Sequence, residues 1–320
     1  MLLAAFLLLL GASLNMLGTA LVTGAYGFIG RNVAKHFANA GWIVAGIGHG
    51  SWAREEWRQW GISEWHTADI TTEALLTYAG SPDVIVHCAG SGSVGFSMTH
   101  PQQDFQRTVG TAVAVLEFVR LHAPQTRIVY PSSAGVYGAA AKLPISESDP
   151  LAPVSPYGVH KTISEKMCSS YARHFGVSVA VVRLFSVYGI GLRKQLLWDA
   201  CTKIGCGENV FFGSGMETRD WLHVGDAASL LAAAGEHASA ACPVVNGGSG
   251  QGEFVRDVLA ELFAAFGRSD APQFSGTARA GDPANYVANI ARARAWGWQP
   301  QTAWRTGIRE YANWFKSGAA

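Results

Sequence analysis

The sequence predicts an α/β fold, in which a doubly wound parallel sheet is followed by a smaller C-terminal α/β portion. Short apolar runs rich in β-branched residues alternate with helical patterns through the first 184 residues. This alternation is typical of a parallel sheet with helices on both faces. Three spaced glycines follow the first apolar run, and after Ser186 the pattern becomes irregular. We therefore expect the sheet in residues 19–184 plus about 220–246, and the second portion in about 185–219 and 247–320.

Composition excludes several classes of protein. The 320 residues are 49% hydrophobic and 15% charged, which is enough for a sizeable core, and the net charge of +1 gives no support for nucleic-acid binding. The five cysteines are scattered without a C-x-x-C pair. We expect reduced thiols in a cytoplasmic protein, with no disulfide framework and no metal site.

Residues 1–18 form an apolar leader whose meaning stays open. The stretch has no Lys or Arg before Arg31, unlike a signal peptide, and it is short for a membrane span. We favour Met16 as the working start, which makes membrane association unlikely to be its role. An additional apolar helix and a membrane anchor remain the alternatives.

The first element to justify is a strand followed by a glycine turn and a helix. Residues 20–22 are apolar and partly β-branched, Gly24, Gly27 and Gly30 follow, and residues 32–38 have a helical pattern. Strand, glycine turn and helix together are typical of a site that binds the pyrophosphate of a dinucleotide at the helix N-terminus. The spacing is G-x-x-G-x-x-G, so the flanking elements carry the argument more than the glycines do.

The second strand, residues 42–47, bears on the choice of cofactor. An acidic residue at its end would hold the ribose hydroxyls of NAD, but no Asp or Glu lies between Arg31 and Arg54. His49, Ser51 or Arg54 would instead contact a 2′-phosphate. We therefore expect NADP, with NAD as the alternative if these residues form an ordinary solvated loop.

The following elements continue the alternation up to the sixth strand. We expect helices at 55–60, 72–78, 104–122 and 156–175, and strands at 66–70, 83–90, 127–130 and 177–184. The last helix has Pro156 in its first turn and Ser155 as a candidate N-cap.

Three side chains fit a proton-transfer site. Tyr157 and Lys161 are four residues apart and so share one helix face, and Ser133 follows the fifth strand at the same sheet edge as the glycine turn. Tyr157 would exchange a proton with a substrate carbonyl or hydroxyl, and Ser133 would hydrogen-bond that oxygen. The ordinary pKa of tyrosine is about 10. We expect the Lys161 ammonium, which would also hold the nicotinamide ribose, and the cationic oxidised nicotinamide both to favour phenolate.

These segments, in this order, resemble the extended short-chain dehydrogenase/reductases, which have a Rossmann fold. Within them they resemble the NAD-dependent epimerase/dehydratase family, whose members modify sugar nucleotides. The resemblance covers nearly the whole chain from Thr19. The matching segments are Thr23-Gly24-Ala25-Tyr26-Gly27-Phe28-Ile29-Gly30, His87-Cys88-Ala89-Gly90, Ser132-Ser133-Ala134-Gly135-Val136-Tyr137-Gly138, Tyr157-Gly158-Val159-His160-Lys161, Arg183-Leu184-Phe185-Ser186-Val187-Tyr188-Gly189, Thr218-Arg219-Asp220-Trp221-Leu222-His223-Val224, Arg279-Ala280-Gly281-Asp282-Pro283 and Trp296-Gly297-Trp298-Gln299-Pro300.

The resemblance implies a nucleotide-diphosphate sugar as substrate. Arg219 and Arg279 match positions that grip its pyrophosphate, and guanidinium groups suit that task. Asp69 and Ile70 match contacts to the adenine side of the cofactor. Further cofactor contacts are expected from Tyr26, Phe28, Ile29, Ala89 and Gly90. Weaker expectations for the substrate pocket are Val94, Ser97, Ser186, Lys194, Gln195 and Trp198, with Phe211 or Phe212 at the base or in the core.

Departures from the family pattern narrow the expected reaction. Ala134 and Gly135 replace the Asp-Glu pair of the sugar dehydratases, and Gly135 also stands where epimerase-reductases have Cys. Ser186 stands where 4-epimerases usually have Asn. We therefore expect reduction of a 4-keto-6-deoxy sugar nucleotide at C4 in surface-polysaccharide or deoxysugar synthesis. The alternatives are an NAD-dependent C4-epimerase of a nucleotide-diphosphate hexose and, more distantly, a silent nucleotide-sensing regulator.

The resemblance also implies a homodimer. Family members commonly pair two helices from each subunit into a four-helix bundle, and here these would be the helices at 104–122 and 156–175.

Overall fold

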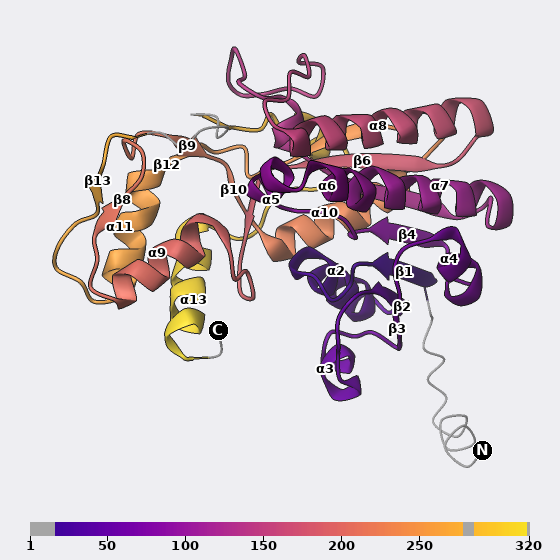
Figure 1. Ribbon diagram of the computed structural model, residues 1–320, viewed down its shortest axis with the longest axis horizontal. Coiled ribbons are helices and arrows are strands. Elements are labelled where there is room, and N and C mark those ends of the chain that lie inside the picture. Colours follow the sequence, from indigo (N-terminus) through magenta and orange to yellow (C-terminus); the bar gives the residue numbers. More distant parts are fainter. Residues whose placement is uncertain (1–16, 278–284, 319–320) are drawn as a thin grey trace.

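The computed structural model describes residues 17–277 and 285–318 (Figure 1). Its elements up to the sixth strand are β1 (Thr19–Thr23), α2 (Phe28–Asn39), β2 (Ile43–Gly48), α3 (Arg54–Gln59), β3 (Glu64–Thr67), α4 (Thr72–Tyr78), β4 (Val84–His87), α5 (Val94–Thr99), α6 (Pro101–Phe105), the π-helical segment η1 (Gln106–Gly110), α7 (Thr111–His122), β5 (Arg127–Ser133), the 3-10 turn η2 (Ala134–Val136), α8 (Pro156–Phe175) and β6 (Val179–Leu184). The elements that follow are β7 (Ser186–Tyr188), α9 (Gln195–Gly205), β8 (Val210–Phe211), β9 (Thr218–Arg219), β10 (Trp221–His223), α10 (Val224–His237), β11 (Val244–Gly247), β12 (Glu253–Phe254), α11 (Val255–Ala265), β13 (Gln273–Phe274), α12 (Ala291–Ala295) and α13 (Trp304–Lys316).

The main sheet has seven strands in the order β11-β6-β5-β4-β1-β2-β3. All neighbouring pairs are parallel, so the expected doubly wound α/β fold is confirmed. The strand order reverses between β1 and β4. In sheets of this kind, ligands bind outside the carboxyl ends of the strands at such a point.

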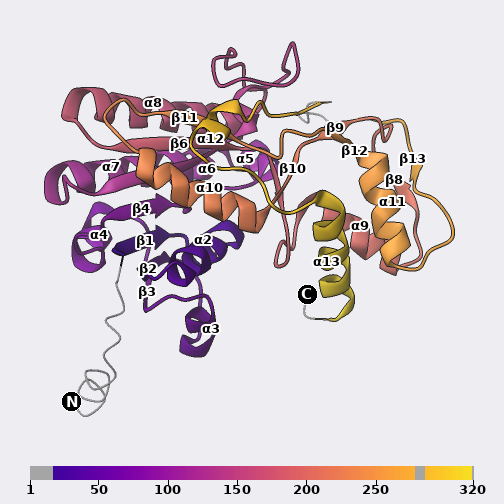
Figure 2. The ribbon, with the colours of Figure 1, turned by 180° about the vertical axis from the view of Figure 1, so that it is seen from behind.

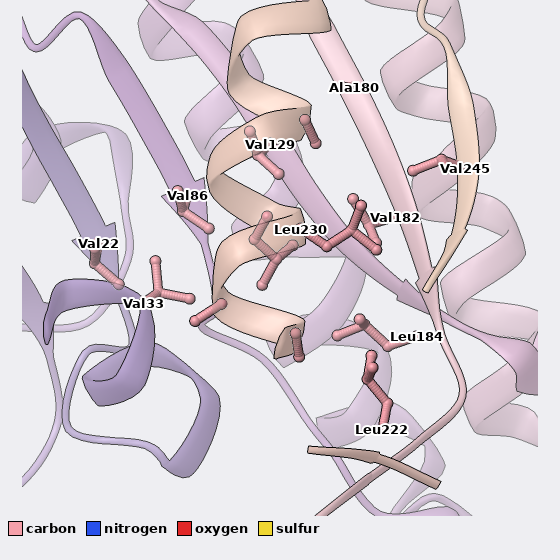
Figure 3. Packing of buried hydrophobic residues seen from close by; sticks show 14 of the residues in the cluster. Val22, Val33, Val86, Val129, Ala180, Val182, Leu184, Leu222, Leu230 and Val245 are labelled. Carbon is pink, nitrogen blue, oxygen red and sulfur yellow. The ribbon is translucent and has the colours of Figure 1, made fainter. Parts of the chain in front are cut away.

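Alternate residues of the strands build a core on each face of the sheet. In β1, Val22 packs into one core and Leu21 into the other, as the two-residue period of a strand requires. Helices α2 and α10 cover the first face, where Leu230 of α10 lies among valines of the strands (Figure 3). Helices α4, α7 and α8 cover the second face.

A third core lies outside the sheet. Helices α9, α11 and α13 contribute Leu197, Leu262 and Ile308 to it, all of them buried. Both ribbon views show these three helices grouped beside the sheet rather than on its faces (Figure 2). The division into two portions at about residues 185, 220 and 246 stays a prediction.

Three elements differ from the sequence-based expectation. The seventh strand, β11, was not named as a strand, although residues 220–246 were expected to belong to the sheet portion; it extends the sheet because its residues pair with Val181–Leu184. The third strand is Glu64–Thr67, not 66–70, because its pairing with β2 ends at Gly48; Asp69 therefore lies in the loop beyond it. The helix expected at 104–122 begins at Pro101, and η1 separates α6 from α7.

The described helices were also compared with the dimensions of a bilayer. None of those within residues 17–277 and 285–318 combines the length and the hydropathy of a membrane-spanning helix.

Candidate active site

The glycine turn joins β1 to α2 with little space between neighbouring backbones. Gly24 has a φ of +69°, and its N–H donates to the carbonyl oxygen of Ile47 at 2.6 Å. A Cβ atom on Gly24 would lie 2.6 Å from the backbone nitrogen of Ala89, and one on Gly30 would collide with the carbonyl oxygen of Gly24. Both positions therefore require glycine, which brings the start of α2 against the end of β4.

The N-terminus of α2 faces a cavity. Gly27 is the N-cap and has no side chain to occupy the space in front of the helix. Phe28, Ile29 and Gly30 follow it, and all four residues line the cavity. Their first-turn N–H groups have no acceptor within the helix, and the helix dipole favours an anion there. This arrangement fits a dinucleotide pyrophosphate.

The cavity has a volume of about 410 Å³ and brings most of the expected site residues together. It is lined by loops and strand ends from β4, β5, β6 and β7 as well as by α2 and α8. The expected residues among its lining are Gly27, Phe28, Ile29, Gly30, Ala89, Gly90, Val94, Ser133, Tyr157, Lys161, Ser186, Lys194, Gln195 and Arg219.

Helix α8, which carries Tyr157 and Lys161, is fixed at its first turn by two serines. Ser155 is the N-cap and accepts from the Gly158 N–H at 3.2 Å, with Pro156 in the first turn, as the sequence predicted. Ser97 of α5 is fully buried and accepts from the backbone N–H of Tyr157 at 3.0 Å. Ser97 therefore positions Tyr157 instead of lining the pocket as expected.

Ser133 and Tyr157 meet at the cavity wall. The Ser133 hydroxyl accepts from the Gly135 N–H at 3.1 Å and is hydrogen-bonded to the Tyr157 side chain, which lowers the pKa of the phenol. Burial has the larger effect, however, and raises the pKa of Tyr157 above its ordinary value. The expected shift towards phenolate, which depends on the cationic nicotinamide as well as on Lys161, stays a prediction.

Lys161 is buried one helical turn beyond Tyr157. Its ammonium donates to the carbonyl oxygen of Pro131 at 2.9 Å and lies 4.8 Å from the centre of the Tyr130 ring. Burial lowers the pKa of Lys161 to about 8, against an opposing effect of Glu165 and other groups. Lys161 is thus cationic at neutral pH and close to losing its charge in mild alkali.

A buried ionic network that the sequence did not reveal lies behind this site. Glu165, one turn after Lys161, accepts a hydrogen bond from Ser132 at 2.5 Å and pairs with the Arg183 guanidinium at 2.7 Å. Arg183 also donates to the Tyr137 hydroxyl at 2.9 Å. The network joins α8 to the end of β5, and so holds Ser133 and Lys161 in a fixed relation.

His87 at the end of β4 is a second polar residue that the sequence did not assign. It lines the cavity and is buried, with Nδ1 at 2.7 Å from the Thr23 hydroxyl and Nε2 at 3.2 Å from the Thr111 hydroxyl. Burial lowers the pKa of His87 to about 3. The imidazole is therefore neutral, and it joins β1, β4 and α7 below the cavity floor.

Other expected site residues lie elsewhere. His49 and Asp69 are next to each other, with Nδ1 and Oδ1 3.2 Å apart, outside the cavity. Tyr26 packs edge-on against Trp52 at 5.3 Å. Arg54 begins α3, Ile70 is buried in the second core, and Gly24 shapes the turn.

Two aromatic residues that were considered for the substrate pocket pack in the protein interior instead. A third expected site residue lies outside the described part of the chain. Phe211 is buried against Phe263, and Trp198 packs edge-on against Phe315 at 5.1 Å. Both support the third core rather than the pocket. Arg279 lies outside the described residues, so its expected role stays a prediction.

Several other lining residues were not assigned to the site from the sequence. Tyr286 lies in a loop more than 120 residues after Tyr157, and its hydroxyl donates to the carbonyl oxygen of Gly138 at 3.0 Å. Val154, Leu184, Phe185, Val187 and Leu192 complete the apolar lining. Within the described ranges, no group of three or more His, Cys, Asp and Glu side chains is arranged to hold a metal ion.

A glycine turn at a helix N-terminus, with Ser, Tyr and Lys converging on the same cavity, defines the class of nicotinamide-dependent oxidoreductases. Comparison with known proteins agrees. The model of the NAD dependent epimerase/dehydratase family matches residues 20–247. The chain belongs to this family and is an NAD(P)-dependent sugar-nucleotide oxidoreductase/epimerase.

Individual relatives span almost the full chain. UDP-glucose 4-epimerase of Mycolicibacterium smegmatis is 31% identical, over 93% of this chain and 98% of its own length. UDP-glucose 4-epimerase of Streptomyces lividans is 30% identical, over 94% of this chain and 97% of its own length. Among solved structures, MoeE5 in complex with UDP-glucuronic acid and NAD is 26% identical, with a TM-score of 0.84 and coverage of 94% of this chain and 100% of its own.

Proposed function

We propose that this protein is an NAD-dependent C4-epimerase of a UDP-linked hexose. The observation that carries the proposal is the convergence of Ser133, Tyr157 and Lys161 on one cavity with the N-terminus of α2. The names of the M. smegmatis and S. lividans relatives support C4 epimerisation and a UDP-sugar. The proposal replaces the expected 4-ketoreduction, for which these relatives offer no support.

Each side chain has a role in this reaction. The N-terminus of α2 would hold the cofactor, and a nicotinamide there would supply the hydride acceptor and donor that inversion at C4 requires. Tyr157 takes the proton of the C4 hydroxyl and gives it back to the carbonyl oxygen. Ser133 hydrogen-bonds the same oxygen and, with the buried Lys161 cation, stabilises the charge that develops there.

Ser186 weighed against an epimerase in the sequence, because 4-epimerases usually have Asn there. Ser186 lines the cavity and follows β6, so its hydroxyl is placed to hydrogen-bond a substrate in the way that an amide would. Hydroxyl and amide groups both donate and accept hydrogen bonds. The substitution is therefore compatible with the proposed reaction.

The missing acid at the end of β2, on which the expectation of NADP rests, is offset by a carboxylate from another loop. Asp69 lies in the loop after β3, and its Oδ1 is 3.2 Å from Nδ1 of His49, which follows β2. A carboxylate at this position disfavours a 2′-phosphate by repulsion and offers an acceptor to a ribose hydroxyl. We therefore propose NAD in preference to NADP, with Arg219 on the substrate diphosphate.

We also propose a homodimer formed through α6, α7 and α8. These helices pack against each other and leave large apolar side chains exposed at two places. Phe105 lies against His160 near Val159 at one place, and Phe175 lies against Arg120 near Leu121 at the other. Covering these side chains in a four-helix bundle would remove apolar surface from water. A strictly monomeric mass by light scattering would contradict the proposal.

The experiment that tests the function uses purified protein without added cofactor. We expect UDP-glucose and UDP-galactose, or the corresponding pair of another UDP-hexose, to interconvert, and denaturation to release NAD. Interconversion should disappear in Tyr157→Phe. Stoichiometric oxidation of NADPH by a 4-keto-6-deoxy sugar nucleotide, without any interconversion of C4 epimers, would favour a reductase instead.

A further inference from the structure

The Lys, Arg, Asp and Glu side chains among the described lining residues of the cavity are all cationic. Lys161, Lys194 and Arg219 line it, and there is no Asp or Glu among the described lining residues. The proposed function uses Lys161 beside Tyr157 and Arg219 at the diphosphate. Lys194 is a third cation in the same cavity for which that function provides no anion.

Lys194 reaches across the mouth of the cavity. It precedes α9 in the loop after β7, and its ammonium donates to the carbonyl oxygen of Gly92 at 3.4 Å, in the loop after β4. Gly92 leads into α5, where Ser97 holds the backbone of Tyr157. Lys194 is therefore linked to the Tyr157 wall of the cavity through the segment that carries Gly92 and Ser97.

The backbone next to Lys194 is held in an uncommon conformation. Gln195 also lines the cavity and has a φ of +68°, which non-glycine residues rarely adopt. Such conformations persist where the surrounding structure enforces them, and they concentrate at functional sites. The Lys194 side chain makes no capping hydrogen bond to α9, and it is directed to Gly92 instead.

We propose that Lys194 selects a sugar nucleotide with a carboxylate on C5, that is, a nucleotide-linked hexuronic acid. This proposal rests on the proposed C4-epimerase function. The C6 group is attached to the carbon next to C4, so it is held close to the Tyr157 side of the cavity when C4 is in place for reaction. A carboxylate there forms a charge-assisted hydrogen bond with Lys194, which is stronger than the bond that a C6 hydroxyl can offer.

The electrostatics of the free protein agree with this role. Desolvation by the cavity wall lowers the pKa of Lys194 below its ordinary value, although the side chain stays exposed to solvent in the free protein. A carboxylate would replace the lost hydration of the ammonium. A neutral hexose would leave that cost in place.

The test is an equilibrium binding measurement on the NAD-loaded protein, in a Tyr157→Phe background so that the ligands are not converted. Calorimetry with UDP-glucuronic acid and UDP-glucose should show tighter binding of the uronate by about 10- to 100-fold. Lys194→Gln should remove most of this preference by weakening UDP-glucuronic acid alone, and Lys194→Arg should restore part of it.

A matched control is Lys203→Gln on the same helix, since Lys203 donates to the carbonyl oxygen of Val210 away from the cavity. It should leave both affinities unchanged. Equal affinities in the parent protein, or an equal loss for both ligands in Lys194→Gln, would overturn the proposal; an equal loss would place Lys194 on the diphosphate.

Turnover separates this proposal from the function on which it rests. With wild-type protein, we expect a higher kcat/KM for UDP-glucuronic acid than for UDP-glucose. Failure to epimerise either sugar would reject the C4-epimerase function, while the binding preference would still decide the role of Lys194. Epimerisation of UDP-glucose with the higher kcat/KM would reject the uronate preference and leave the epimerase function standing.

Discussion

Gly158 of α8 packs directly on Gly135, so that a Cβ atom at residue 158 would lie 2.5 Å from the carbonyl oxygen of Gly135. Gly158 follows Tyr157, and the Gly135 N–H is bonded to the Ser133 hydroxyl. The close approach of these two glycines therefore sets the distance between the helix that carries Tyr157 and the turn that carries Ser133.

Gly158→Ala should separate Tyr157 from Ser133 and lower kcat by at least about tenfold, because misplacement of a catalytic group by a fraction of an ångström is costly. Gly205→Ala on α9 is the matched control, since a Cβ there meets no atom within 4 Å; it should leave kcat unchanged and stabilise the protein slightly. Unchanged kcat in Gly158→Ala would mean that the Gly135 turn moves to accommodate the methyl group without displacing Ser133 from Tyr157, and would contradict the prediction.

Tyr157→Phe should reduce the rate of epimerisation by about 10²- to 10⁴-fold, the usual effect of removing a general acid–base group. The phenol hydroxyl is bonded to Ser133, while the backbone N–H is held by Ser97 and remains so in the variant. Circular dichroism and NAD content should therefore match the wild type. Residual activity near the wild-type level would remove Tyr157 from the proton transfer.

Lys161 should give the protein a measurable dependence on alkaline pH. Its pKa is about 8 when folded and near its ordinary value of 10.5 when unfolded. Between these values the unfolded chain binds more protons, so the contribution of Lys161 to the free energy of unfolding rises with pH. In urea titrations, Lys161→Met should be more stable than wild type at pH 7, and this difference should narrow from pH 8 to pH 10. A constant difference would contradict the buried, cationic lysine.

His87 should make the free energy of unfolding depend on pH in the acidic range. Its pKa of about 3 in the folded state lies below the ordinary value of 6.5, so the unfolded chain binds the extra proton in between. Stability from neutral His87 is present above about pH 6.5 and is lost as pH falls towards 3, by about 1.4 kcal/mol per pH unit. The stability of wild type relative to His87→Gln should fall accordingly between pH 6 and pH 4. Parallel curves would show that His87 is not buried as a neutral group.

The Glu165–Arg183 pair makes a prediction about stability. Glu165→Ala leaves the buried Arg183 guanidinium without its carboxylate and should lower the free energy of unfolding by about 3–5 kcal/mol. Glu236→Ala, at an exposed position on α10, is the control and should change it by less than about 0.5 kcal/mol. A small effect of Glu165→Ala in chemical denaturation would show that water reaches Arg183.

Features with a local physical cause were predictable from the sequence. The alternation of apolar runs and helical patterns specifies the parallel sheet, and Ser155 with Pro156 specifies where α8 begins. The glycines at 24, 27 and 30 specify the turn because their steric requirements are confined to a few neighbouring residues. Ser133 was predictable because the carboxyl ends of parallel strands share one edge, and Tyr157 and Lys161 because residues four apart share one helix face.

Features that depend on distant residues were decided only by the tertiary structure. Ser97 and Tyr157 are separated by 60 residues, Glu165 and Arg183 by 18, and Lys194 and Gly92 by 102. The spacing of residues within a short stretch of sequence does not predict such pairs, because burial and the packing of separate elements bring them into contact. The sequence by itself determined the fold, the glycine turn and the three side chains that we propose for catalysis. The arrangement of the charges around them, and with it the proposed choice of cofactor and sugar, arises from contacts that exist only in the folded chain.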